Sequence, residues 1–301
     1  MKYNKIYRTA ICGGILTAAL LATTANASEV TPTFAISGER IEQSFDFGVD
    51  ESDATIDTIT LTPGFAWGDW HVSASLPWQS IDGEYFFNNL YPNLAQTCNR
   101  INQLTPLQKF LLVRNTQLTQ ESLDYCAETG GVENASVEDS VSGWNDVEIF
   151  ANYFIPAGST WLAGSVGFGY QHDNGDEYEG LGNGARQLFT ETTWMASSRL
   201  LSLSATLGYY FIVEDNSAIG LKDHGYGSLD GRLYLGEHVE LGISYFYQQT
   251  DNDVFDDYDY LTYSSTFILG KHWSARLFIS DYQNEPGLPD EEFGGSIVYM
   301  L

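Results

Sequence analysis

The strongest constraint on the fold is a two-residue periodicity that recurs along most of the chain. From Val239 to Gln248, apolar and aromatic side chains occupy the odd positions, and polar or small side chains occupy the even positions apart from Phe246. The segment from Leu201 to Phe211 alternates in the same way, with Tyr210 as the one large ring on the polar face. Such alternation indicates β-strands with one apolar face and one face suited to water.

The same test predicts twelve strands in an all-β chain. They span residues 34–46, 56–67, 70–83, 146–155, 161–172, 186–195, 199–213, 225–235, 239–250, 259–269, 272–283 and 292–301. Most are long enough to cross a bilayer, because a tilted transmembrane strand needs about 9–11 residues.

The links between these strands alternate between short turns and longer acidic loops. The short links are Gly68-Asp69, Pro156 to Thr160, Ala196 to Ser198, Gly236 to His238, and Gly270-Lys271. This rhythm is typical of an up-and-down antiparallel transmembrane β-barrel with short periplasmic turns and longer external loops. An even number of strands also brings both ends of the barrel to the periplasmic side.

The amino end carries the three parts of an export signal. Basic residues at positions 2, 5 and 8 precede an apolar stretch, and Ala25-Asn26-Ala27 supplies the small residues of a cleavage site. We therefore expect residues 1–27 to be removed after Ala27 and residues 28–301 to form the barrel. No later segment approaches the roughly 20 apolar residues of a membrane-spanning helix. The predicted location is the outer membrane of a Gram-negative bacterium.

Charge excludes one class of partner. The chain has 40 acidic and 13 basic residues, three of the basic ones in the predicted signal. A strongly acidic protein disfavours nucleic acid as a ligand. The expected partners are outer-membrane lipids and lipopolysaccharide, together with the barrel-assembly machinery, because the last strand resembles a carboxy-terminal assembly signal with Phe293, Ile297, Tyr299 and Leu301 on one face.

Residues 84–145 break the alternation and predict an insertion in the second external loop. Thr105-Pro106 opens a stretch with the apolar periodicity of one or two short helices. Cys98 and Cys126 flank it, and an exported chain favours a disulfide between them. Three positions of the insertion stay open: a constriction inside the barrel, a lid over its mouth, or a contact with another subunit.

The water-facing positions of the strands supply the candidate lumen-lining residues. These are Glu148, Asn152, Glu191, Asp230, Arg232, Glu240 and Arg276. Inside a barrel they could set a preference for cations or neutral solutes, or hold a narrow interior together through opposite-charge pairs. None of the five histidines lies in a recognisable nucleophile-base motif, so we expect no catalytic residues. We expect no cofactor, and no metal site, because the acidic run from Asp251 to Asp257 lacks the glycine and glutamate of an EF-hand loop and no histidine lies between Cys98 and Cys126.

Three stretches resemble the outer-membrane transporter family associated with the meta pathway of phenol degradation. They are Gly68-Asp69-Trp70 continuing through Val72 to Trp78, the strand opening Gly143 to Val147, and the closing strand from Gly294 to Tyr299. The resemblance implies a barrel that moves small solutes, hydrophobic or aromatic ones among them. It carries over no functional residue, and the insertion flanked by cysteines departs from the family pattern.

The sequence thus predicts an outer-membrane channel or facilitator for small solutes. One alternative is a structural or surface-interaction barrel whose lumen is plugged. A lesser alternative is an outer-membrane lipid hydrolase. The sequence identifies neither the solute nor the oligomeric state.

Overall fold

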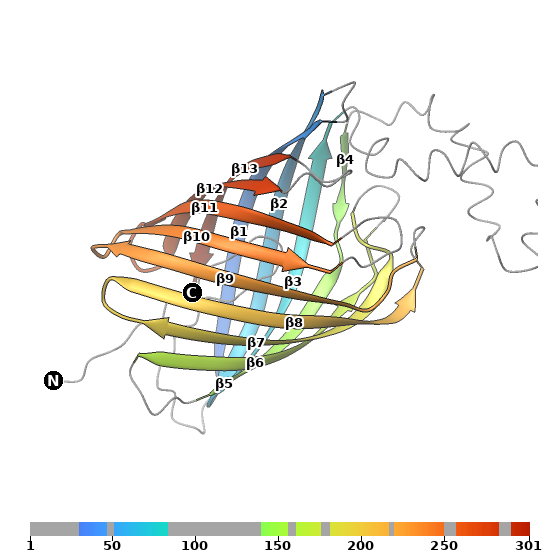
Figure 1. The fold of residues 1–301 in the computed structure, drawn as a ribbon. Coiled ribbons are helices and arrows are strands. Elements are labelled where there is room, and N and C mark those ends of the chain that lie inside the picture. Colours follow the sequence, from blue (N-terminus) through green and yellow to red (C-terminus); the bar gives the residue numbers. More distant parts are fainter. Residues whose placement is uncertain are drawn as a thin grey trace, which may run out of the picture.

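The chain forms a closed antiparallel β-barrel in a computed structural model (Figure 1). The structure describes residues 30–46, 51–83, 140–155, 161–175, 181–216, 220–249, 257–282 and 290–301. Twelve strands make the wall, and a short thirteenth pairs with one of them. The strands are β1 Val30–Asp46, β2 Glu51–Trp67, β3 Trp70–Asp82, β4 Ser140–Trp144, β5 Val147–Ile155, β6 Leu162–His172, β7 Ala185–Ser197, β8 Leu201–Asp215, β9 His224–Leu235, β10 Val239–Gln248, β11 Tyr258–Ile268, β12 Trp273–Tyr282 and β13 Glu291–Met300.

The first and last strands close the barrel. β1 pairs with β13 from Ala35 opposite Met300 to Ser44 opposite Glu291. Beyond the paired strands, the amide of Leu301 donates to the carbonyl of Phe34 at 3.0 Å. Closure pairs the first strand of the wall with the last, so neither is left as an edge strand in contact with lipid.

The expectation of a twelve-stranded antiparallel barrel is confirmed. Every expected strand is present, and the largest differences are at the starts of the first two, which begin at Val30 and Glu51 instead of 34 and 56. The alternation is weak at those starts, which explains why the sequence placed them late.

The structure differs from the sequence prediction at the end of the expected insertion. Residues 140–144 are not part of a loop but form β4, which pairs with the distal part of β3, while β5 pairs with its proximal part. Between the pairs Ser75–Glu148 and Trp78–Trp144, β3 has two residues and the opposite segment has three. The extra residue is a β-bulge. Residues 84–139, with the expected helices and disulfide, and the expected signal lie outside the described residues.

The two faces of the wall have opposite chemistry. Large apolar side chains such as Leu203, Leu229 and Ile243 are exposed on the outer face, whereas polar side chains such as Ser202 and Thr262 are buried on the inner face. An apolar exterior around a polar interior is expected of a barrel whose solvent is lipid. Among the described residues, no helix has the length and apolar character needed to span a membrane.

Tight turns join the strands at one end of the barrel. Three of them contain a glycine with a positive φ: Gly68 at 58°, Gly236 at 76° and Gly270 at 95°. Only glycine adopts this backbone region without a steric cost. We call this end the tight-turn end and the opposite one the long-loop end; the carboxyl terminus lies at the tight-turn end (Figure 1).

The lipid-facing assignment predicts a depth-dependent effect of charge. Leu207 is 67% exposed on the outer face in the middle of β8, and Val213 lies on the same face nearer the long-loop end. Leu207→Arg should lower the free energy of unfolding in lipid vesicles by about 2–4 kcal/mol, because it places a charge near the bilayer midplane. Val213→Arg, the matched control, should cost about 0–1 kcal/mol. Urea unfolding followed by tryptophan fluorescence measures both; equal losses would contradict the assignment.

Candidate functional site

Seven aromatic rings form a continuous row on the inner wall, which we call the aromatic arc. Neighbouring ring centroids lie 5.5, 5.2, 5.4, 6.2, 5.0 and 4.7 Å apart. These spacings are those of interacting aromatic pairs. In order, the rings belong to Phe150 of β5, Phe189 of β7, Tyr210 of β8, Tyr226 of β9, Phe246 of β10, Tyr260 of β11 and Tyr282 of β12. The arc therefore spans more than half of the wall, toward the long-loop end.

Glycines on neighbouring strands let these rings lie flat against the wall. A β-carbon at Gly169 would lie 2.0 Å from Cζ of Phe189, and one at Gly167 would lie 2.2 Å from Cζ of Phe150. At Gly208 it would lie 2.1 Å from Cζ of Tyr226. Any larger residue would push the ring into the lumen, so the glycines keep the arc thin.

Two glutamates hold tyrosine rings of the arc in place. The hydroxyl of Tyr226 donates to Oε2 of Glu191 at 2.9 Å. The hydroxyl of Tyr282 donates to Oε2 of Glu292 at 3.2 Å, and Nε2 of Gln43 donates to the same oxygen at 3.1 Å. Buried tyrosine hydroxyls need such partners, and hydrogen bonds to charged groups are among the stronger ones.

The first three sequence-predicted residues lie at the β5 to β7 end of the arc. Glu148 and Asn152 flank Phe150 on β5, and Glu191 follows Phe189 by two positions on β7. In the strand register Asn152 pairs with Gly167, which pairs with Glu191. Oδ1 of Asn152 is buried without a hydrogen-bond partner. This end therefore presents hydrogen-bond acceptors beside aromatic rings.

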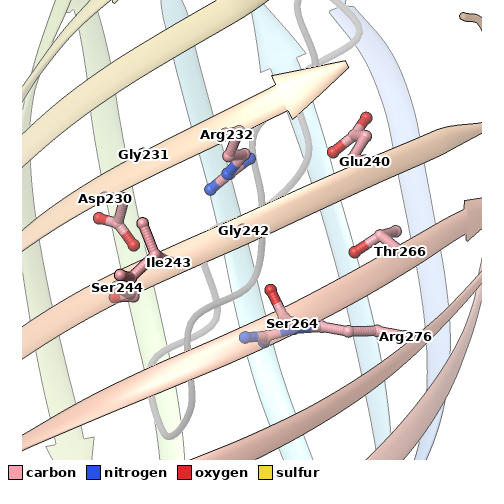
Figure 2. A pocket seen from close by; sticks show the side chains of 10 residues that line it. All are labelled: Asp230, Gly231, Arg232, Glu240, Gly242, Ile243, Ser244, Ser264, Thr266 and Arg276. Atoms are coloured by element: carbon pink, nitrogen blue, oxygen red, sulfur yellow. The ribbon is translucent and has the colours of Figure 1, made fainter. Parts of the chain in front are cut away.

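The other four sequence-predicted residues share a pocket near the tight-turn end, which we call the charged pocket. Figure 2 shows Asp230 and Arg232 on β9, Glu240 on β10 and Arg276 on β12 around Gly242. Arg232 and Ser264 are the register partners of Gly242. A β-carbon at Gly242 would lie 2.6 Å from Oγ of Ser264, so the glycine makes room for that hydroxyl. The guanidinium carbon of Arg276 lies 5.0 Å from the ring centroid of Phe278, within the range of a cation–π contact.

The loop between β6 and β7 folds onto the inner wall of β2 to β4. Leu181 packs with Ala54, Ile56 and Ile81 in a buried apolar cluster. Its methyl carbon Cδ1 would lie 2.7 Å from a β-carbon at Gly143, so the glycine of β4 makes room for it. The loop thus covers the part of the wall near the long-loop end that the arc leaves open.

Asp146, at the β-bulge, holds this loop. Its Oδ1 accepts from the amides of Asn174 and Gly175 at 3.1 and 2.9 Å. Its Oδ2 accepts from the amide of Asn183 at 3.0 Å and from Nε2 of Gln171 at 2.9 Å. One buried carboxylate therefore satisfies three backbone donors of the loop, and the bulge is the feature that places it there.

Sequence reasoning did not find the aromatic arc. The available signal was the pair of rings on polar faces, Tyr210 of β8 and Phe246 of β10, which interrupt the alternation of their strands. Asp146 was also missed, because its role depends on the bulge. Among the described residues, no group of three or more histidine, cysteine or acidic side chains is arranged to hold a metal ion.

Comparison with known proteins supports the fold. No family model and no curated protein matches the chain. An outer-membrane channel from Pseudomonas putida F1 superimposes with a TM-score of 0.61 at 8% identity, over 90% of this chain and 95% of that chain. The KdgM porin gives 0.46 at 8% identity over 88% and 98% of the two chains, and the CymD monoaromatic hydrocarbon channel 0.44 at 10% over 89% and 87%. The first of these likenesses shows that the chain shares the barrel fold of an outer-membrane channel.

The glycines beneath the arc predict a change in the width of the lumen. Gly169→Ala should displace the ring of Phe189 from the wall and reduce the single-channel conductance in planar bilayers. Gly38→Ala is the matched control, because a β-carbon there has no atom within 4 Å. Heat-dependent gel migration should first show that both variants are folded. Equal conductance of the two folded variants would then contradict the flat placement of the ring.

The contacts of Asp146 predict that its loss frees the β6–β7 loop. In Asp146→Ala, hydrogen exchange of the Asn174, Gly175 and Asn183 amides should be faster by roughly tenfold or more, because each loses a charge-assisted hydrogen bond. Mass spectrometry of loop peptides measures the exchange. Asp82→Ala removes an exposed carboxylate of β3 and should leave these amides unchanged; unchanged exchange in both variants would sink the assigned role.

Proposed function

We propose that the protein is a channel of the bacterial outer membrane that passes small solutes and favours those with an apolar or aromatic ring. The location is supported by the closed barrel with its apolar exterior and by the likeness of the fold to an outer-membrane channel. A closed wall of this kind suits lipid, since its strands pair their backbone polar groups with neighbouring strands around the barrel.

The aromatic arc is the observation that carries the choice of solute. A channel for hydrated ions has no use for seven contacting rings on its inner wall. A ring-bearing solute can instead exchange one aromatic contact for the next as it moves, each contact being worth about 0.5–1.5 kcal/mol beyond area burial. Contacts this weak and this numerous hold a solute without trapping it, which transport requires.

The outer wall supports the proposed contact with membrane lipids. Trp78 of β3 pairs with Trp144 of β4 on the exposed face near the long-loop end, where an aromatic belt would meet headgroups. Arg40 and Asp57 form an exposed ion pair on the same outer wall. Asp57 lies on β2 two residues closer to the long-loop end than Ile59, the register partner of Trp78. Lipopolysaccharide and the assembly machinery remain proposed partners.

A ring-bearing probe tests this function directly. In planar bilayers the protein should give steady conductance, and phenyl glucoside should interrupt the current for longer than methyl glucoside does. Phe246→Ala removes a half-buried ring in the middle of the arc and should shorten these interruptions severalfold, since stacking contacts of about 0.5–1.5 kcal/mol are lost. Tyr245→Ala on the outer face of the same strand is the matched control.

Two outcomes would count against the proposal. Equal interruptions by both glucosides would remove the preference for rings. A silent bilayer with folded protein would favour a structural or surface-interaction barrel with a plugged lumen, an alternative for which the buried cluster around Leu181 is the supporting observation.

A further inference from the structure

We infer that the β5 to β7 end of the arc binds the positively charged group of an organic solute, so that the solutes favoured by this barrel are ring-bearing organic cations. This inference rests on the proposed function and names its substrate class. It concerns Glu148, Asn152 and Glu191 together with the rings of Phe150, Phe189 and Tyr210. We call these six residues the acceptor end.

The acceptor end holds two carboxylates without a basic partner. Within the described residues, the charged groups that act on Glu148 are Asp146 and Glu191, both acidic. Glu191 accepts a hydrogen bond from the hydroxyl of Tyr226. Glu191 is buried, with 7% of its surface exposed. A buried carboxylate is stabilised by a cationic partner and otherwise takes up a proton. A cation brought by the solute would supply the missing partner.

Aromatic rings lie near the Glu191 side chain. A β-carbon at Gly167 would lie 2.2 Å from Cζ of Phe150 and 3.2 Å from Cγ of Glu191, so these two side chains converge over Gly167. Phe150 and Phe189 are stacked with an interplanar angle of 11°, and the ring of Tyr210 follows at 5.2 Å from that of Phe189. Aromatic faces attract cations, most strongly where water is excluded, and aromatic cages are the usual binding sites of organic ammonium groups.

Asn152 provides an independent indication of a donor-bearing ligand. The residue is 7% exposed, and its Oδ1 accepts no hydrogen bond. A buried carbonyl oxygen without a donor costs about 1–3 kcal/mol. Asn152 and Glu191 lie at the same register level with Gly167 of β6 between them, so a group with several N–H donors would meet acceptors on both sides. An ammonium group carries such donors, and a carboxylate carries none.

The rest of the lumen wall lacks this combination. Glu292, at the other end of the arc, has Arg276 within electrostatic reach, as does Glu39 of β1. The charged pocket contains two arginines beside its two carboxylates. Only the acceptor end, among the described parts of the wall, joins uncompensated acceptors to stacked rings.

Two ring-bearing probes of similar size and opposite charge test the inference. Benzylammonium and benzoate at pH 7, added to the channel in planar bilayers, should interrupt the current for different times, with benzylammonium held roughly tenfold longer because of its cation–π and carboxylate contacts. The double variant Glu148→Gln and Glu191→Gln keeps the shapes and removes both charges, and it should bring the two dwell times close together. Glu42→Gln on the exposed face of β1 is the matched control and should keep the difference.

The outcomes separate this inference from the proposed function. Equal dwell times of benzylammonium and benzoate in the unaltered protein, or an unchanged difference in the double variant, would overturn the cation site. Ammonium chloride, added at the same concentration as benzylammonium, should not reduce the current interruptions that benzylammonium causes. If it did, an inorganic cation would compete equally for the site, and the organic character of the ligand would be overturned. If phenyl glucoside interrupts the current and benzylammonium interrupts it for no longer, the cation inference fails and the proposed function stands. If no ion and no probe passes the barrel, the proposed function fails as well.

Discussion

The fold depends on one constraint: every backbone polar group of a wall that faces lipid must find its partner within the wall. The pairing of β1 with β13 meets it by closing the sheet on itself, and the hydrogen bond from Leu301 to Phe34 extends the closure to the last residue. Closure has a second consequence, because it gives each strand an inside and an outside. Side-chain parity along the strand then decides which chemistry faces the lumen.

Side-chain parity and the positions of glycines together divide the inner wall into the charged pocket and the aromatic arc. Along β10 the inward positions run from Glu240 through Gly242 to Phe246, so one strand contributes both to the charged pocket and to the aromatic arc. Glycines make room for a neighbouring side chain in both places. Gly242 accommodates the hydroxyl of Ser264, whereas Gly169 accommodates the ring of Phe189. The lumen is consequently polar near the tight-turn end and aromatic toward the long-loop end.

The β-bulge between β4 and β5 is the break in parity that positions Asp146. By adding a residue opposite β3, it turns Asp146 into a buried position where the carboxylate binds the backbone of the β6–β7 loop. The same loop delivers Leu181 to the apolar cluster on β2 and β3. A local irregularity in one strand therefore fixes a loop that covers the wall opposite the arc.

The sequence by itself determined the twelve-stranded barrel and most of its strand bounds, because a two-residue period and glycine turns are local properties that need no knowledge of neighbours. Even the inward rings of Tyr210 and Phe246 could be read as exceptions within their strands. Only the tertiary structure decided which inward residues meet. Whether seven rings form one arc, whether Asn152 lies beside Glu191, and whether Asp146 reaches a loop all depend on register, closure and one bulge. Those are relations between strands, and a shift of one residue in pairing would undo each of them.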